Sequence, residues 1–576
     1  MQTRSSLGVP CRRGYALLLV IVFTGAALIL ATGIFQYAST TASLNHRHNE
    51  YQRAVAAAEA ATEKVVARVT ADYREQGDGY ILGRLDSYRS MVPTSSEFPE
   101  CGNYLFQNLS GQEDRLEVTY NPGSGFEMSS GKYSGLRGVK STLRVVANAK
   151  ARYSSASPAG AVFQDIELLR IPLFQFAIFY NLNLEFNNHP PMTVYGPVHC
   201  NTNIYMSSHD ITTFNGDVTA AGQILHAKNP LSPESAGSGP FVYNGDRDSG
   251  VSTLNLPIGT NTSPAAVRAV IEVPPALEDP YSSMGQQRYY NKADLIIIVQ
   301  DMNIITTSGL RNSFATQVPA TDVTNFVSTN VTFYNKRQLK TIKTTQIDIA
   351  KLILWKATNI YFNSAIPSQD IRTIFVVDQR TQTASTQSGV RLINGQALPV
   401  GGLTVATPNP IYVRGHYNAP PAHLGTTNTT LTQPASVAAD SVTLLSTAWS
   451  DANSSLGLSS RIANHTTINA AMLTGFVETS SSRFSGGVEN LPRFLEDWDN
   501  RILSYNGSMV AMYTSRISTN AWGGSDVYNA PDRHWGLDQN YLVEGKLPPA
   551  TPNVTVLIRG RWRMPAPYST NVLAGF

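Results

Sequence analysis

A cluster near the end of the chain contains side chains of the kinds that bind or cleave sugars. Its members are Glu489, Glu496, Asp497 and Trp498. Paired carboxylates catalyse glycoside hydrolysis, and an indole ring offers a flat apolar face to a sugar. The run 490–498 also fits a short helix with Pro492 in its first turn, which places Arg493 and Glu496 one turn apart as an ion pair. We expect this structural role, and a carbohydrate site is the alternative.

Histidines and acidic loops give weak indications of metal binding. His46 and His48 are two residues apart and would face different sides of a helix. His199 adjoins Cys200, but no second ligand pair follows at the spacing of a zinc site. The loop 244–250 has two carboxylates without the spaced glutamate of an EF-hand. We expect no metal, no cofactor and no catalytic activity.

The chain has 3 cysteines. Cys11 precedes a long apolar run, whereas Cys101 and Cys200 follow it. Two cysteines on the far side of a membrane favour a disulfide over a metal site, because exported proteins fold in an oxidising compartment. The sequence does not place the two side chains close together, so the bonded and the free states both stay open.

Residues 15–37 contain no charged side chain. At about 1.5 Å per residue, a helix of this length crosses a bilayer core of about 30 Å. Arg12 and Arg13 precede the run and the first acidic residue is Glu50, so we expect the N-terminus in the cytoplasm and the rest outside. The run is longer than the roughly 7 to 15 apolar residues of a cleaved signal peptide. The sequence therefore predicts a single membrane pass.

The junction at the start of this run resembles that of the type IV prepilins, which have a short basic leader ending in Gly. The matching residues are Arg12-Arg13-Gly14-Tyr15-Ala16-Leu17. The resemblance implies that residues 1–14 are a leader removed by a prepilin peptidase and that Tyr15 begins the mature chain. It also implies an inner-membrane protein with other pilin subunits as partners and an ectodomain in the periplasm or at the cell surface.

The fifth residue of the expected mature chain is Leu19, where most major pilins have Glu. The family's glutamate is thought to neutralise the terminal amine of the subunit ahead, and an unpaired charge in lipid is costly. Its absence resembles the K-type pseudopilin of type II secretion, which is placed at or near a filament tip. The helix as a whole looks like that of PilX-type minor pilins. The alternative is that the helix never enters a filament.

Apolar and small residues continue beyond residue 38 at alternating intervals of four and three. This spacing predicts an amphipathic helix over residues 38–76 that ends before Gly77. Its face consists of Leu44, His48, Tyr51, Val55, Ala58, Thr62, Val65 and Val69. The Ala-rich stretch 51–61 resembles the corresponding segment of PilX-type proteins, and its small side chains allow close approach of a neighbour. That neighbour is either another pilin helix or the chain's own ectodomain.

Beyond residue 77, short alternating runs bounded by Gly, Asn, Asp and Pro replace the helical period. They predict a mainly β ectodomain carried on the long pilin-like helix. The runs suggest the stacked strands of a β-helix, but no fixed period holds, so stacked β-sandwiches compete. We divide the ectodomain into β-rich parts at 77–264 and 386–576, with an α+β insertion at 265–385.

The charge balance argues against nucleic acid as a partner. Arg4, Arg12 and Arg13 account for the net charge of +3, so the ectodomain is neutral and has no basic stripe.

The sequence as a whole leaves two classes of function open. One is a minor pilin or pseudopilin-like assembly protein that displays its ectodomain for filament initiation, tip or adhesion roles. The other is a membrane-anchored carbohydrate-binding or carbohydrate-active β-helix protein, with surface polysaccharide as its partner.

Overall fold

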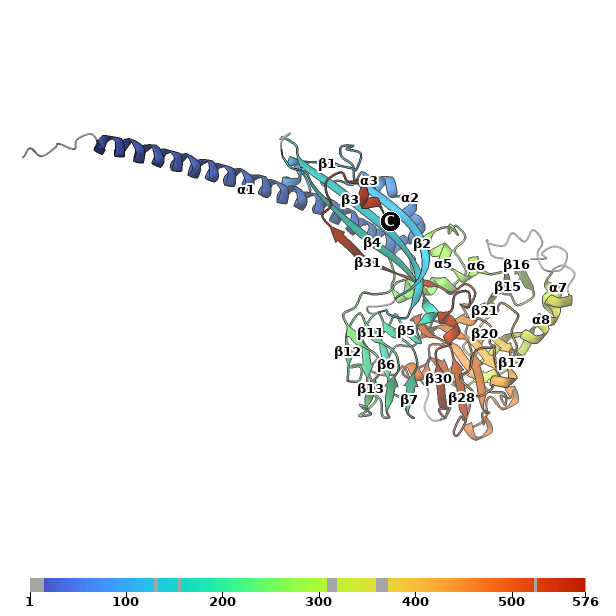
Figure 1. Cartoon of the computed structure of the whole chain (residues 1–576). Coiled ribbons are helices and arrows are strands. Elements are labelled where there is room, and N and C mark those ends of the chain that lie inside the picture. The colour runs from blue at the N-terminus through green and yellow to red at the C-terminus, as the bar shows by residue number, and fades with distance from the viewer. Residues whose placement is uncertain are drawn as a thin grey trace, which may run out of the picture.

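The computed structural model describes residues 15–128, 133–153, 157–307, 319–358, 371–522 and 526–574. A long N-terminal helix is followed by a mainly β ectodomain, which confirms the predicted fold class at this level. Figure 1 shows that the helix projects far from the rest of the molecule. The ectodomain has two parts, an antiparallel sheet beside the second half of the helix and a larger body of mostly parallel strands.

Helix α1 (Tyr15–Gln76) comprises the whole apolar run and the Ala-rich segment. It ends where predicted, because Gly77 adopts a left-handed φ of 75° that breaks the helical path and that glycine tolerates without a steric penalty. Two short helices, α2 (Asp78–Gly83) and α3 (Leu85–Arg89), follow directly.

The second half of α1 packs against a five-stranded antiparallel sheet. Its strands are β1 (Tyr104–Gln107), β2 (Glu117–Glu127), β3 (Arg137–Ala151), β4 (Gly160–Pro172) and β31 (Asn553–Arg563). Alternate residues of β3, namely Leu143, Val145 and Ala147, face α1, as the two-residue period of a strand requires. The C-terminal strand β31 pairs with β4, so the last strand of the chain lies in the same sheet as the first strands of the ectodomain.

The parallel body begins with three short strands in each 20-residue turn. In the largest sheet, Ile178 pairs with Val198, and Val198 pairs with Val218. The side chain of Asn201 donates a hydrogen bond to the side chain of Asn181, 20 residues earlier in the chain. The strands of this half are β5 (Ile178–Tyr180), β6 (Leu184–Phe186), β7 (Met192–Val194), β8 (Val198–Cys200), β9 (Ile204–Met206), β10 (Thr212–Phe214), β11 (Val218–Ala220), β12 (Ile224–Leu225), β13 (Phe241–Tyr243) and β14 (Arg247–Ser249). A 20-residue period therefore holds over residues 178–225, but a 29-residue interval follows between β11 and β14, so the expectation that no fixed period holds is wrong only for these first turns.

The largest sheet extends to 11 strands, in the order β14-β11-β8-β5-β29-β26-β23-β21-β19-β15-β16. After β14 the chain passes through α4 (Pro264–Val267), α5 (Ser283–Gln287) and α6 (Tyr289–Lys292) and enters the opposite end of the sheet. It then returns strand by strand until Met509 pairs with Ile178. The returning strands are β15 (Leu295–Val299), β16 (Ile304–Thr307), β19 (Thr373–Asp378), β21 (Leu403–Ala406), β23 (Ala435–Ala439), β26 (Ala471–Phe476) and β29 (Met509–Thr514).

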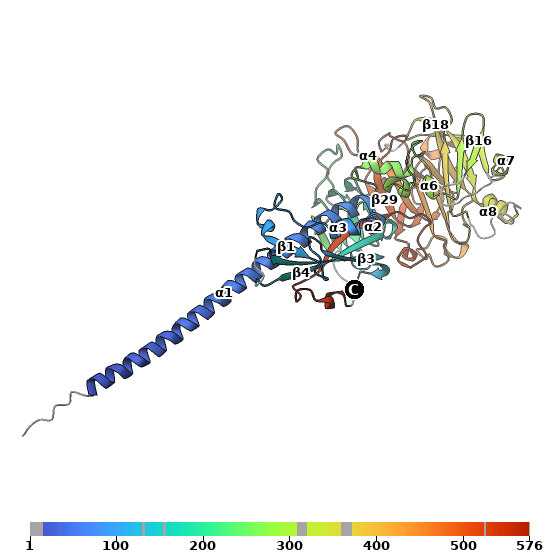
Figure 2. The same ribbon diagram turned by 90° about the horizontal axis from the view of Figure 1, so that it is seen from above.

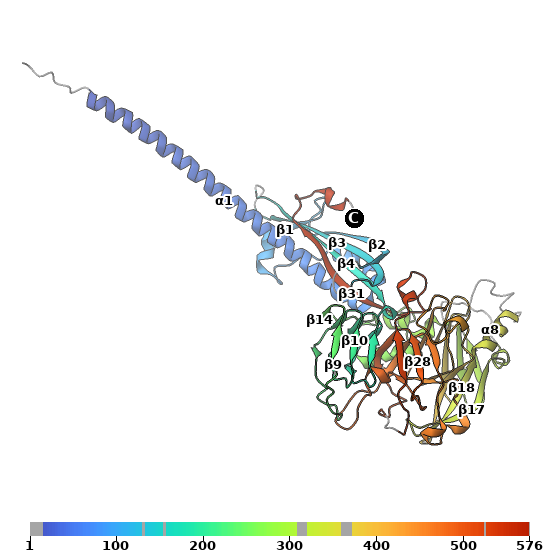
Figure 3. The same ribbon diagram turned by 60° about the horizontal axis from the view of Figure 1, so that its bottom comes forward.

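Two smaller sheets complete the returning half. One has six strands, β17 (Val327–Asn335), β18 (Lys340–Asp348), β20 (Thr386–Ile393), β22 (Ile411–Arg414), β24 (Val442–Leu445) and β27 (Pro492–Arg493). The other has β25 (Thr466–Asn469), β28 (Ile502–Asn506) and β30 (Asp532–Gly536). Helices α7 (Ala320–Val323) and α8 (Ile349–Thr358) lie at the end of the parallel body opposite β12 (Figure 1). One cluster of buried apolar side chains extends through both halves. Figure 3 shows strands of the first half (β9, β10 and β14) beside strands of the returning half (β17, β18 and β28). Strands β15 and β19 belong to the segment 265–385, which we predicted to be an α+β insertion. They lie in the 11-stranded sheet together with strands that precede and strands that follow this segment in the chain.

Candidate functional site

The first half of α1 has no part of the described protein packed around it. Its large apolar side chains are exposed, including Ile29 at 75% and Phe35 at 76%. Figure 2 shows this half extending away from the body as a free rod. Of the helices in the described ranges, α1 is long and apolar enough to cross a membrane. Tyr15 and Leu19 are exposed at its start, and the predicted leader with Gly14 lies outside the described residues.

The second half of α1 is held by the chain's own ectodomain. Of the predicted apolar face, Val55, Ala58, Thr62, Val65 and Val69 are buried. They pack in one cluster with residues of β3 and β4, whereas Leu44 is exposed. The helix therefore changes character near Ala54, from an uncovered apolar rod to a packed amphipathic segment.

Cys101 and Cys200 are both free thiols. Cys101 lies in the cluster between α1 and the antiparallel sheet, and Cys200 lies in the core of the parallel body. Of the two states that the sequence left open, the structure therefore has the free one, and the two residues belong to different cores. Burial raises the pKa of the Cys200 thiol to about 11, and its Sγ donates a hydrogen bond to the Leu182 carbonyl at 3.2 Å.

Three of the four predicted sugar-binding residues are packed against or hydrogen-bonded to other residues of the protein. Trp498 is fully buried with its ring against Phe494. The buried Glu496 accepts hydrogen bonds from the backbone N–H and the hydroxyl of Ser446, both at 2.6 Å. Asp497 accepts a hydrogen bond from Asn529 at 2.8 Å.

The segment 490–498 is not the short helix that the sequence suggested. Pro492 and Arg493 form β27, which pairs in parallel with β24. Arg493 donates to the Ser518 carbonyl and the Ser515 hydroxyl, so the predicted ion pair with Glu496 is not formed. Pairing with a buried neighbouring strand overrides the local helical preference.

Glu489 differs from the other three because it lines a cavity of about 450 Å³. It lies in a short 3₁₀ turn (Val488–Asn490) that follows Gly486 and Gly487, both with left-handed φ angles. A Cβ atom on Gly487 would lie 2.4 Å from Glu489 Oε2, and one on Gly486 would lie 2.9 Å from the Trp522 ring. The two glycines therefore let the carboxylate and the indole approach the same turn.

The wall of this cavity contains polar atoms without hydrogen-bond partners among the described residues. They are Glu489 Oε2, Asn187 Oδ1 and Arg533 Nε. Burial raises the pKa of Glu489 to about 7, although the nearby charge of Arg533 acts in the opposite direction. An unpaired buried polar group costs about 1–3 kcal/mol. This wall is therefore suited to a ligand that supplies the missing partners.

Aromatic side chains line the same cavity and are held in place by hydrogen bonds. Trp522 Nε1 donates to the Tyr528 hydroxyl at 2.8 Å, and that hydroxyl donates to Asn490. The rings of His189 and His209 stack with their centres 4.2 Å apart. The cavity thus combines fixed apolar rings with convergent polar groups, which is the usual composition of a small-molecule site.

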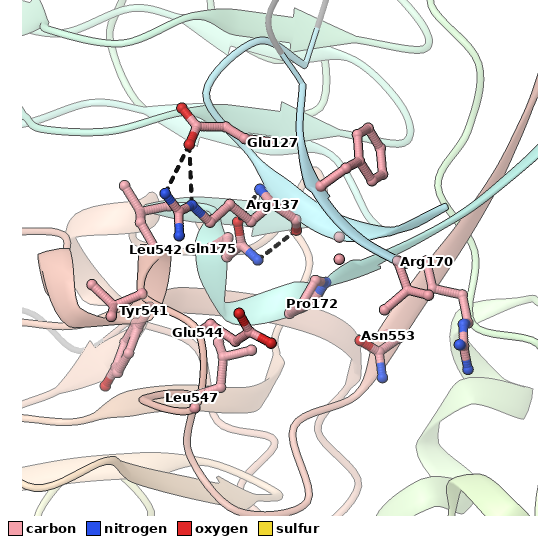
Figure 4. Close-up of a pocket in the computed structure, with 16 residues that line it drawn as sticks. Glu127, Arg137, Arg170, Pro172, Gln175, Tyr541, Leu542, Glu544, Leu547 and Asn553 are labelled. Carbon is pink, nitrogen blue, oxygen red and sulfur yellow. Dashed lines mark hydrogen bonds and ion pairs between the residues drawn. The ribbon is translucent and has the colours of Figure 1, made fainter. Parts of the chain in front are cut away.

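A second cavity, of about 380 Å³, lies where the antiparallel sheet meets the parallel body. Figure 4 shows Glu127, Arg137 and Gln175 on one side and the segment from Tyr541 to Leu547 on the other. Arg137 is paired with Glu127 at 2.8 Å, and its backbone exchanges two hydrogen bonds with Gln175. These groups satisfy one another, so this cavity is a seam between the two parts of the ectodomain and a weaker candidate site.

Of the residues that line this cavity, Glu489 could be predicted from the sequence, whereas Asn187, Trp522 and Arg533 could not. They come from segments far apart in the chain, and only the fold brings them together. His189 and His209 are 20 residues apart, so the internal repeat is the feature that could have linked them. No group of three or more His, Cys, Asp or Glu side chains suited to a metal occurs in the described ranges. No family model, curated protein or solved structure matches this chain.

Proposed function

We propose that this chain is a membrane-anchored assembly protein of the bacterial cell surface, of the minor pilin or pseudopilin type. The observation that carries the proposal is the division of α1 into a half held by the antiparallel sheet and an apolar half that is uncovered. An exposed apolar surface of this size needs lipid or other apolar helices around it. The prepilin-like residues at Gly14 and Tyr15 support a protein that uses both surroundings in turn.

In this proposal a prepilin peptidase cleaves after Gly14, and the rod from Tyr15 then passes from the membrane into a bundle of pilin helices. Leu19 brings no carboxylate to neutralise the amine of a subunit ahead, so the chain suits a tip position. The antiparallel sheet fixes the angle between the rod and the parallel body. The 20-residue register of that body favours a β-helix as the part displayed outward, for filament initiation or adhesion.

Intact-mass measurement of the membrane-extracted protein tests the first step. In a host with active prepilin peptidase, the chain should begin at Tyr15, and Gly14→Val should leave the leader attached. Gly8→Val is the matched control, because it changes a leader glycine away from the junction and should leave cleavage intact. A wild-type chain that begins before Gly14, or within residues 38–43 as after signal-peptide cleavage, would contradict the assignment.

Photo-crosslinking tests the second step. A photoreactive residue at Ile29, on the uncovered rod, should form adducts with other pilin-type subunits, whereas one at the exposed Leu277 of the parallel body should not. If neither position yields a subunit adduct while the filament system assembles, the helix remains in the membrane as a simple anchor.

A further inference from the structure

We propose that the cavity beside Glu489 binds a neutral pyranose sugar, which is held through its hydroxyl groups and packs against the ring of Trp522. This activity is independent of membrane anchoring and assembly. It assigns a ligand class to the outward-facing body of the protein.

The unpartnered atoms in the wall define what the ligand must offer. Glu489 Oε2 and Asn187 Oδ1 are acceptors, and Arg533 Nε is a donor. A hydroxyl group both donates and accepts, so neighbouring hydroxyls of one sugar satisfy acceptors and donor together. Glu489 and Arg533 form no ion pair within 4.0 Å in the described part of the chain, so Glu489 Oε2 and Arg533 Nε do not satisfy each other.

The aromatic groups account for the other face of a sugar. Trp522 is half-buried, and its indole N–H is occupied by Tyr528, so the ring orientation is fixed before any ligand arrives. The ring of Phe484 packs edge-on against the ring of Trp522, with the ring centres 6.1 Å apart. The C–H face of a pyranose packs well on such a ring, and a volume of about 450 Å³ falls in the range of small-molecule sites.

The charge of the surroundings favours a neutral ligand over an acidic one. Glu234 lines the cavity together with Glu489, and the buried Glu185 is close enough to raise the pKa of Glu489 further. Arg533 is the cation in this wall, and its Nη1 already donates to the His189 carbonyl at 2.9 Å. Carboxyl groups therefore outnumber the guanidinium, and a uronate would meet repulsion that a neutral hexose avoids.

Titration of the full chain with glucose, galactose, mannose, N-acetylglucosamine and glucuronate, followed by saturation-transfer NMR and tryptophan fluorescence, tests the proposal. The protein is kept in a detergent without a sugar headgroup, because a maltoside would occupy the site. At least one neutral sugar should bind more tightly than glucuronate. Glu489→Gln and Trp522→Ala should each weaken its binding tenfold or more.

Matched controls separate the cavity from the fold. Glu496→Gln changes another buried glutamate whose oxygens are already bonded to Ser446, and Trp562→Ala removes an exposed indole on β31. Both should bind the sugar as wild type does. Circular dichroism shows whether Glu489→Gln is folded, and Trp522→Ala carries the test if it is not. Three results would overturn the proposal. They are no binding of any neutral sugar by wild type when the sugar concentration is 50-fold the protein concentration or higher, tighter binding of glucuronate than of the neutral sugars, and unchanged sugar binding in Trp522→Ala.

Discussion

Arg559 of β31 and Glu63 of α1 form a two-pronged ion pair, with Nη1 to Oε1 at 2.7 Å and Nη2 to Oε2 at 2.8 Å. The two residues are 496 positions apart in the chain. The same strand pairs with β4, and its Val554 is fully buried. The first helix and the last strand therefore belong to one module, and the parallel body is inserted between β4 and β31.

Deleting residues 553–576 should loosen the grip of the ectodomain on α1. Without β31 the edge of β4 is open, and the helix loses one of the strands that flank it. Limited trypsin digestion should then cut at Arg68 and Arg74, which lie in the packed half of the helix. Arg559→Ala is the control, because the ion pair is 58% and 39% exposed at its two ends and contributes less than about 1 kcal/mol. A truncated protein as resistant as wild type would show that β31 is dispensable.

Gly160 of β4 lies against the backbone of α1. A Cβ atom there would be 2.4 Å from the Val55 nitrogen and 2.7 Å from the Ala54 carbonyl carbon. Gly160→Val should therefore push the helix off the sheet and lower the free energy of unfolding by about 1–3 kcal/mol or more, measured in urea.

Gly79→Ala provides the comparison for this test. Gly79 is in α2 and has nothing within 4 Å of its Cβ position, so alanine should leave stability unchanged or raise it by about 0.5–1 kcal/mol. Equal effects of the two changes would mean that α1 does not touch β4 as closely as described.

The long helix could be predicted in detail because its determinants are local. An uncharged run, an Ala-rich amphipathic continuation and Gly77 specify its start, its face and its end without reference to the rest of the chain. The sequence could not decide what the face of Val55, Ala58 and Val65 packs against, because any apolar partner satisfies the same pattern.

The parallel body was harder to predict because its 20-residue repeat extends over only a short part of the chain. Asn181 and Asn183 recur as Asn201 and Asn203, and these asparagines bond to one another between turns. A 29-residue interval already separates Asn215 from Asn244 in the following turn, where an insertion occurs. Pairing with a distant segment also determines the structure of residues 490–498. Their sequence has a helical preference, but Pro492 and Arg493 form a strand because they pair with β24.

Asp440 is predicted to be among the most sensitive positions of the body. Its buried carboxylate receives the Arg268 guanidinium at 2.7 Å and the backbone N–H groups of Arg516, Ile517 and Ser518. Asp440→Ala leaves the buried Arg268 with Glu272 as its remaining carboxylate partner and leaves the three backbone N–H groups without their acceptor. The change should lower the free energy of unfolding by about 3–5 kcal/mol in a urea titration.

The exposed pair of Asp86 and Arg89 in α3 is the matched control for Asp440. The Asp86 side chain is 85% exposed, so Asp86→Ala should change stability by less than about 1 kcal/mol. A loss at Asp440 as small as this would imply that water reaches Arg268.

Both ectodomain thiols should be unreactive in the native protein and free after unfolding. Burial raises the pKa values of both Cys101 and Cys200, so little of the reactive thiolate is present at neutral pH. Iodoacetamide without reductant should add no mass to the folded ectodomain and two adducts, at Cys101 and Cys200, in urea. If these adducts appear only after reduction, Cys101 and Cys200 are joined by a disulfide, which would contradict the prediction.

Glu496 should make the ectodomain less stable as the pH rises toward neutrality. Burial raises the pKa of Glu496 to about 7, against the bonds from Ser446 and the charges of Arg414 and Arg461, which favour the ionised form. In the unfolded chain its pKa is about 4.3. The folded state therefore holds the proton more tightly. The stabilising contribution is complete below about pH 4.3, falls as the pH rises to about 7, and is constant above that, a change of about 4 kcal/mol.

Urea titrations from pH 4.5 to 8 measure this slope. Burial also raises the pKa of Glu489, to about 7, and the pKa values of Asp78, Glu185 and Asp538, so wild type should lose stability through several groups and Glu496→Gln through one fewer. The variant should therefore show a shallower decline with pH, while its stability above pH 7 matches or exceeds that of wild type because residue 496 no longer has a carboxyl group that must ionise in the core. A slope identical to that of wild type would mean that Glu496 ionises as easily in the folded protein as in the unfolded chain.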